Sequence, residues 1–345
     1  MIARRFFLAV ALAVMCALAA AQDAEAQIDI GPTLSEILKR GFVICGMTEA
    51  DGFAEPLDGN EWRGFDVDIC RALASAIFDD PTKVMYSALP AKERAASLQG
   101  NWVDLLASGA PWTQSRDTGQ RIIYAGVSLY DGQTFLVRRQ RSFASARDLS
   151  GVSVCVQRGT SYELTLADFF NARRAPYEPR AFETFEEAAA GYEAGKCDAL
   201  TADASMLYAA RAKFASPADH AVLPDMLSKA PRGPVVRQGD DQWLNIVRWT
   251  LYAMINAEEL QVSILNADLA LKSENPDIRR LVGVDGDLGA GLGLAKNWAF
   301  RIIKHIGNYG DMFDRNLGPA TPMAMDRRIN ALWSNGGLMY APPVR

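Results

Sequence analysis

The sequence contains 345 residues, of which 49% are hydrophobic and 22% are charged. A chain of this length and composition can form two compact lobes with hydrophobic cores, which excludes general disorder. The formal net charge is −5, and basic and acidic residues are interspersed. We therefore expect the main partner to be a small molecule, and not a nucleic acid or an anionic membrane surface.

The first 26 residues have the pattern of a cleaved secretory signal. Two arginines precede an apolar run, and the segment ends in the small-residue sequence AEA. We therefore expect residues 1–26 to be a signal peptide and the mature protein to begin near Gln27. No second long apolar run follows, so no transmembrane anchor is expected.

Strands and helices alternate in the first part of the mature chain. This alternation is typical of a parallel sheet covered by helices, an α/β fold. Apolar residues at a spacing of 3.6 mark the helices, and short apolar runs mark the strands. The expected helices are at 33–40, 64–78 and 91–101, and the expected strands are at 41–47, 83–89 and 103–109.

A second alternating block begins after Leu149, so the two halves of the chain look like one unit made twice. Extended runs at 132–139 and 233–239 connect the blocks, which predicts two lobes, two hinge strands and a cleft between the lobes. We assign residues 27–137 to the first part of lobe 1 and 138–232 to lobe 2. Residues 233–345 form the second part of lobe 1 with a C-terminal extension.

Four cysteines remain after the signal is removed: Cys45, Cys70, Cys155 and Cys197. An even number in an exported chain predicts disulfide bonds. Three pairings are possible, and proximity in the sequence favours Cys45 with Cys70 and Cys155 with Cys197. The chain has two isolated histidines and no C-x-x-C motif, so no metal site is expected.

The sequence lacks the motifs of common enzyme classes. It has no G-x-S-x-G, no H-E-x-x-H, no Walker loop and no dinucleotide-binding fingerprint. We therefore expect a protein that is not an enzyme and that needs no cofactor.

Candidate binding residues lie after the ends of the expected strands. Arg116 follows Thr113 in a polar turn, and a guanidinium can hold a carboxylate through two parallel hydrogen bonds, although a surface arginine fits this position equally well. Asp203 follows a strand, where it either binds an ammonium group or caps the next helix. Phe53, in the loop after the first strand, either stacks on a ligand or closes the core.

The turn "RGTS", Arg158 to Ser161, joins an expected strand to a helix. Its backbone N–H groups would lie at a helix N-terminus, which favours an anion, and the alternative is an ordinary capped helix. With the residues above, the turn provides both signs of charge that a zwitterionic ligand needs.

The sequence resembles the periplasmic solute-binding proteins of polar amino-acid ABC transporters, in particular the general L-amino-acid-binding type. The matching stretches span essentially the whole mature chain, and the C-terminal ones are specific to that branch. They include "GFDVDICRALA", "CVQRGTSYELTLADFF", "LPDMLSKAPRGPVVRQGDDQW" and "ALWSNGGLMYAPPVR". The resemblance implies a two-lobed type II periplasmic binding protein. It also implies a monomer in the periplasm that serves an ABC permease in the inner membrane.

The resemblance also assigns roles to single residues. It implies that Arg116 holds the α-carboxylate of an amino acid with help from Thr160 and Ser161. It assigns the α-ammonium to Asp203 and makes Phe53 an aromatic wall of the cleft.

Gln157 matches a position that often contacts the ligand side chain. The sequence departs from its relatives at two other places, residues 108–111 and Arg158. Relatives tend to carry Arg-Asn-Thr-Thr where this chain has Ser108, Gly109, Ala110 and Pro111. The change removes a cation, an amide and two hydroxyls, and proline has no backbone N–H to replace them.

Three hypotheses follow from this departure. Arg158, where relatives commonly have a small polar residue, supplies a second cation for a dicarboxylic or more anionic solute. Alternatively, the small residues widen the pocket for a bulkier ligand, or the protein has lost ordinary amino-acid transport.

Two other function classes remain as alternatives. A periplasmic dehydratase or lyase on the same fold would use Glu49 or Asp51 as its acid. A sensor module would report ligand binding to a membrane receptor.

Overall fold

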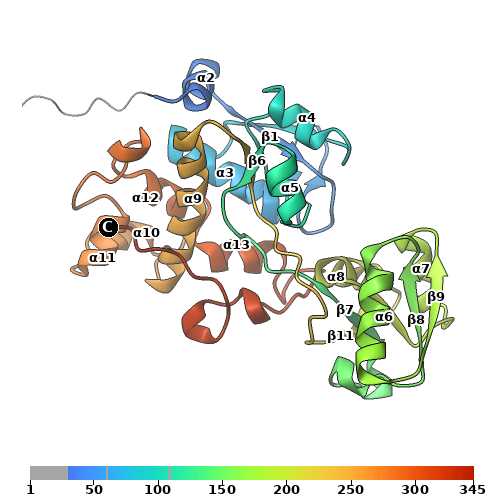
Figure 1. Ribbon diagram of the computed structural model, residues 1–345. Helices are drawn as coiled ribbons and strands as arrows, with labels where there is room; N and C mark the ends of the chain where they lie inside the picture. Colours follow the sequence, from blue (N-terminus) through green and yellow to red (C-terminus); the bar gives the residue numbers. More distant parts are fainter. Residues whose placement is uncertain (1–29, 60, 108–109) are drawn as a thin grey trace, which may run out of the picture.

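The structure, a computed structural model, describes residues 30–59, 61–107 and 110–345. The predicted signal peptide, Ser108 and Gly109 lie outside these ranges. The chain folds into two lobes joined by two crossing segments (Figure 1). Each lobe is built on its own five-stranded sheet.

The sheet of lobe 1 has the strand order β4-β1-β5-β12-β6. Its central strand β1 is buried along most of its length, as expected for a strand that is covered on both faces. The strands are β1 Val43–Met47, β4 Val84–Ala88, β5 Leu105–Leu106, β6 Ile122–Tyr124 and β12 Val235–Arg237. A separate two-stranded sheet pairs β2 Glu55–Pro56 with β3 Trp62–Arg63.

The sheet of lobe 2 has the strand order β11-β7-β10-β8-β9. Phe135, Val154 and Phe170 belong to a core that is confined to this lobe. The strands are β7 Gln133–Arg138, β8 Val152–Gln157, β9 Tyr177–Phe182, β10 Ala199–Asp203 and β11 His220–Val222.

The crossing segments differ from the predicted hinge strands. Strand β7 pairs only within the sheet of lobe 2, so the expected boundary between residues 137 and 138 falls inside a strand. The crossings are residues 125–132 and 223–234, which precede β7 and β12. Both sheets are also mixed and not purely parallel. The strand that follows each crossing runs back antiparallel to its neighbours, β12 beside β5 and β6, and β7 beside β10 and β11.

The two crossings are paired with each other by backbone hydrogen bonds. Leu129 and Arg232 form an antiparallel bridge, with N–H groups donating in both directions at 3.2 and 2.8 Å. A side chain at Gly233 would place its Cβ only 1.8 Å from the carbonyl oxygen of Gly126. Glycine is therefore required where the two crossings approach most closely.

Helices cover both sheets. The long helix α9 in lobe 1 buries Trp243, whose indole N–H donates to the carbonyl of Asp104 at 2.8 Å. The helices of lobe 1 are α2 Pro32–Arg40, α3 Phe65–Phe78, α4 Arg94–Gln99, α5 Gln114–Gly119, α9 Asp241–Glu259, α10 Ala267–Ala270, α11 Pro276–Leu281, α12 Trp298–His305 and α13 Tyr309–Asn316. Those of lobe 2 are α6 Ser161–Arg173, α7 Phe185–Glu193 and α8 Ala204–Ala212. None of the helices in the described ranges has the length and apolar character needed to cross a membrane.

The C-terminal segment contacts both lobes. It starts from α13 in lobe 1, and its Arg328 donates to the carbonyls of Val222 and Leu223 at the end of β11. In return, Arg211 of α8 donates to the carbonyl of Met323 at 2.8 Å. This segment therefore holds lobe 2 against lobe 1 beside the crossings.

Each lobe contains one disulfide bond, with the pairing favoured by the sequence. Cys45 of β1 is bonded to Cys70 of α3, and Cys155 of β8 is bonded to Cys197. Neither disulfide bond joins one lobe to the other, and neither involves a residue of the crossings.

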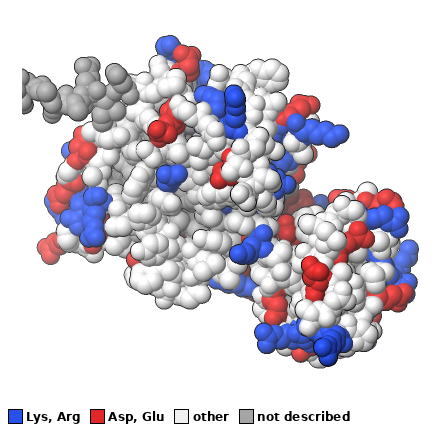
Figure 2. All heavy atoms as spheres, viewed as in Figure 1, with Lys and Arg blue, Asp and Glu red and all other residues white. Residues whose placement is uncertain are grey.

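Charged residues of both signs are interspersed over the face shown in Figure 2. This distribution agrees with the expectation, from the sequence, of a small-molecule partner.

Candidate functional site

Arg116 lies in α5 on lobe 1, and its side chain is tied to the altered loop. Its Nη1 donates to the carbonyl of Pro111 at 2.7 Å, and Tyr124 donates its hydroxyl to the carbonyl of Ala110 at 2.9 Å. Thr113 precedes the helix and is exposed, with its Oγ1 3.2 Å from Ser115 Oγ. The loop therefore presents one carbonyl oxygen, that of Pro111, to Arg116, and it occupies a guanidinium donor.

Two further arginines gather near Arg116. Burial lowers the pKa of Arg94, and repulsion from Arg232 and then from Arg116 lowers it further. The Nε atoms of Arg94 and Arg232 are buried without a hydrogen-bond partner in the described ranges. Three guanidinium groups, two of which have a buried donor without a partner, have the chemistry that an anion requires. We call these three residues the arginine cluster.

Phe53 links the arginine cluster to the core of lobe 1. Its ring lies 5.4 Å from the guanidinium carbon of Arg232 and 6.1 Å from the ring of Phe65. Only 4% of Phe53 is exposed. It closes the core, and it also lines a narrow cavity together with Ser128, Leu129 and Arg232.

Two buried carboxyl groups lie near Arg232. Asp203 ends β10, and its side chain makes no capping bond to α8. Asp131 lies on the first crossing, accepts from Ser205 Oγ at 2.6 Å, and lies 4.0 Å from Arg232 Nη1. We call Asp131 and Asp203 the acidic pair.

The acidic pair is held under electrostatic strain. Burial raises the pKa of Asp203 to about 6, and repulsion from Asp131 adds to the effect. A hydrogen bond from Tyr162 and the charge of Arg232 oppose this rise. Burial, followed by the charge of Asp203, raises the pKa of Tyr162. A cation beside the pair would relieve this repulsion.

The "RGTS" turn lies where the sequence predicts it, between β8 and α6. Thr160 is the N-cap residue of α6, but its hydroxyl donates to the carbonyl of Gln157 at 2.8 Å and makes no cap bond. Ser161 begins the helix and is exposed. Arg158 forms an ion pair with Glu183 at 2.9 Å, with both side chains largely exposed.

Sequence reasoning overlooked four residues of this site: Arg94, Arg232, Asp131 and Tyr162. Arg232 lies between Pro231 and Gly233, immediately before an expected hinge strand. A charged residue beside an expected hinge was the signal in the sequence that could have marked Arg232 as a candidate. In the described ranges no group of acidic, histidine or cysteine side chains is arranged to hold a metal ion.

Comparisons with known proteins agree with this architecture. Residues 47–264 match the model of the bacterial extracellular solute-binding proteins, family 3. The chain belongs to this family. A family 3 protein named the general L-amino acid-binding periplasmic protein AapJ, from Rhizobium johnstonii, is 48% identical over 316 residues, which are 91% of this chain and 93% of that protein.

Two other matches cover most of the chain. The glutamate/glutamine/aspartate/asparagine-binding protein BztA of Rhodobacter capsulatus is 42% identical over 342 residues, 99% of this chain and 98% of that protein. The solved structure of an ABC transporter periplasmic binding protein from Brucella ovis with glutathione bound is 49% identical. It has a TM-score of 0.79 and covers 91% of this chain and 99% of that chain. The family and the type II binding-protein fold that the sequence predicts are confirmed.

Proposed function

We propose that this family 3 protein binds an L-amino acid or a small peptide that carries one ammonium group and one or two carboxylates. The arginine cluster would hold the carboxylates, and the acidic pair would hold the ammonium. The observation that carries this proposal is the position of Arg232, which interacts both with Arg94 of the arginine cluster and with the two buried carboxyl groups of the acidic pair.

The arginine cluster favours a solute with more than one anionic group. Arg116 is partly occupied by the carbonyl of Pro111, whereas Arg94 and Arg232 retain buried unpaired Nε atoms. In this proposal Arg94 and Arg232 would supply the additional positive charge that the sequence suggested at Arg158. Glutamate, aspartate and glutathione, named for two of the relatives, have this chemistry.

The protein would deliver its solute to a permease and perform no chemistry on it. We infer export by the signal at residues 1–26, action in the periplasm as a monomer, and an ABC permease as the partner, as the names of the relatives suggest. In the sequence, the first part of lobe 1 would precede lobe 2 and the second part would follow it. The boundary between the first part of lobe 1 and lobe 2 would lie at residue 132 instead of residue 137. Gln157, Thr160 and Ser161 would complete the site from lobe 2 when the lobes close.

The enzyme alternative has little support at its proposed acids. Asp51 is paired with Lys213 of lobe 2 at 2.5 Å on the surface, and Glu49 is exposed. Neither carboxyl lies in a buried environment of the kind that keeps a catalytic acid protonated.

Thermal melting of the protein purified from the periplasm, checked by calorimetric titration, tests this function. The panel is L-glutamate, L-glutamine, L-arginine and glutathione, with glutarate and putrescine as ligands that carry only one sign of charge. A ligand present at a hundred times its Kd should stabilise the protein by about 2.7 kcal/mol. We expect shifts with zwitterions that carry two carboxylates and none with glutarate or putrescine. Equal shifts with glutarate would refute the role of the acidic pair.

A further inference from the structure

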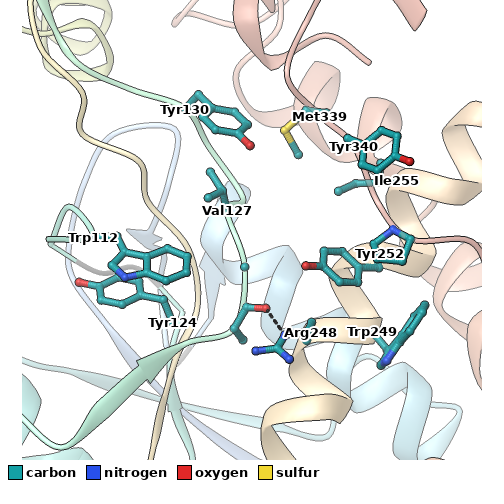
Figure 3. A pocket seen from close by; sticks show the side chains of 13 residues that line it. Trp112, Tyr124, Val127, Tyr130, Arg248, Trp249, Tyr252, Ile255, Met339 and Tyr340 are labelled. Atoms are coloured by element: carbon teal, nitrogen blue, oxygen red, sulfur yellow. Dashed lines mark hydrogen bonds between the residues drawn. The ribbon is translucent and has the colours of Figure 1, made fainter. Parts of the chain in front are cut away.

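A second pocket lies behind the first crossing, on lobe 1. It has a volume of about 460 Å³, which is within the range of small-molecule sites. Its walls come from the segment around residues 124–130, from α9 and from the C-terminal segment (Figure 3). We call it the hinge pocket, and six aromatic residues line it: Trp112, Tyr124, Tyr130, Trp249, Tyr252 and Tyr340.

The hinge pocket is separate from the amino-acid site. Different residues of the first crossing line the two sites. Ser128 and Leu129 line the narrow cavity with Phe53, whereas Val127 and Tyr130 line the hinge pocket. None of the residues of the arginine cluster or the acidic pair lines it. A ligand in the hinge pocket would therefore leave the amino-acid site unoccupied.

The hinge pocket is held in shape by buried hydrogen bonds. Asn330 fixes the main chain of Tyr130 at 2.7 and 2.9 Å, and Asn256 of α9 donates to the carbonyl of Pro342 at 2.8 Å. The rings of Trp112 and Tyr124 are stacked with centroids 4.9 Å apart. A preformed aromatic pocket loses little conformational entropy when a planar ligand enters.

Arg248 supplies the only charge among the described residues that line this pocket. Its Nε donates to the carbonyl of Ala125 at 3.2 Å, and its terminal nitrogens make no hydrogen bond or ion pair within the described part of the chain. Figure 3 shows the guanidinium at one end of the pocket, with the hydroxyls of Tyr130 and Tyr252 directed into the space between the crossing and α9. A guanidinium with free terminal donors is suited to a carboxylate.

We propose that the hinge pocket binds a small aromatic carboxylate, with the carboxylate on Arg248 and the ring among Trp249, Tyr252 and Tyr130. The aromatic walls supply apolar area and edge-to-face contacts. The single positive charge selects an anion, and the two tyrosine hydroxyls can donate to it.

Phenylacetate is the probe, because it has a ring and a carboxylate but no ammonium group for the acidic pair. Binding is measured by ligand-observed NMR titration of the whole protein, with phenylacetamide as the neutral control. We expect saturable binding of phenylacetate and binding of phenylacetamide that is at least tenfold weaker.

Variants locate the probe. Arg248→Gln should weaken phenylacetate binding at least tenfold, and Arg248→Lys should restore part of it. Tyr340→Ala, at a position that is 65% exposed, should weaken binding severalfold without affecting the fold. Arg116→Gln, in the amino-acid site, should leave the affinity for phenylacetate unchanged.

The opposite pattern would overturn the proposal. Loss of binding in Arg116→Gln with retention in Arg248→Gln would place phenylacetate in the amino-acid site. Equal binding of phenylacetamide would remove the role of Arg248, and no saturable binding to the wild-type protein would show that the pocket does not take this class of ligand.

Discussion

The side chain of Asn330 makes two hydrogen bonds with the main chain of Tyr130, 200 residues earlier in the sequence. The amide oxygen accepts from the N–H of Tyr130, and the amide nitrogen donates to its carbonyl. Asn330 is 2% exposed, so water cannot replace it. The first crossing is thereby fixed to the C-terminal segment of lobe 1.

Asn330→Ala should reduce the stability of the protein. The change leaves the N–H and the carbonyl of Tyr130 unsatisfied, at about 1–3 kcal/mol for each buried group. Chemical denaturation should show a free energy of unfolding lower by about 2 kcal/mol or more. Asn335→Ala, at an exposed position in the same segment, is the matched control. Equal stabilities of the two variants would contradict this account of the crossing.

The affinity for the proposed zwitterion should fall when the pH falls below about 6. Asp203 has a pKa raised to about 6 in the ligand-free protein, and only its ionised form attracts an ammonium group. Calorimetric titrations between pH 5 and pH 8 should therefore show a constant affinity above pH 7 and a decline below pH 6. Asp203→Asn should abolish both the high affinity and this decline. An affinity that stays constant down to pH 5 would rule out Asp203 as the ammonium partner.

Asp203→Asn should also stabilise the ligand-free protein at pH 7. The pKa of this carboxyl is higher in the folded than in the unfolded chain, so its contribution to stability is fully present below about 3.8 and is lost as the pH rises through about 6. The lost contribution is on the order of 3 kcal/mol. The melting temperature of the variant should exceed that of the wild type at pH 7, and the difference should shrink at pH 4. A lower melting temperature at pH 7 would contradict the strain assigned to the acidic pair.

Arg94→Gln should weaken binding of a dicarboxylic solute by about 10- to 100-fold, the cost of one hydrogen bond to a charged group. Because Arg94 is repelled by Arg232 and Arg116, the ligand-free melting temperature should not fall. Arg158→Gln is the control, since Arg158 is paired with Glu183 on the surface. If Arg158→Gln proved the more damaging change, the second cation would be Arg158, as the sequence first indicated.

Removing the Cys45–Cys70 bond through the double substitution Cys45→Ala and Cys70→Ala should destabilise lobe 1. The bond closes a loop with a sequence separation of 25, and the chain-entropy model assigns about 3.5 kcal/mol to such a loop. Hydrogen exchange should show faster opening of β1 and α3 and little change in β8 and β10. Equal acceleration in both lobes would mean that the lobes unfold as one unit.

Much of the fold was predictable because its signals are local. Helical periodicity located α2 and α3, and apolar runs located β1 and β4 within a few residues. Proximity of the cysteines predicted both disulfide bonds. The place of Asp203 at the end of a strand was also predictable, and its role in binding stays a prediction.

The remaining parts of the site depend on contacts between distant segments. Arg232 and Asp131 meet because the two crossings pair in one register, which no local pattern specifies. The extended run at 132–139 was expected to be a hinge. Most of it is strand β7, which pairs antiparallel with β10 inside lobe 2, so the first crossing lies before this run. The ion pair of Arg158 with Glu183 was not predictable from a local pattern, because Glu183 follows the neighbouring strand, 25 residues later.

Strand β12 has a consequence for the order in which the chain folds during synthesis. It lies between β5 and β6 in the sheet of lobe 1, although it follows every strand of lobe 2 in the sequence. The sheet of lobe 2 can therefore be completed once residue 222 has emerged, whereas that of lobe 1 must wait for residue 237. Until then β5 and β6 lack the strand that joins them, and contacts between such distant segments form slowly. Lobe 2 is thus the part that can fold first, and a chain stopped after residue 222 would retain an unfinished lobe 1 with unpaired strand edges.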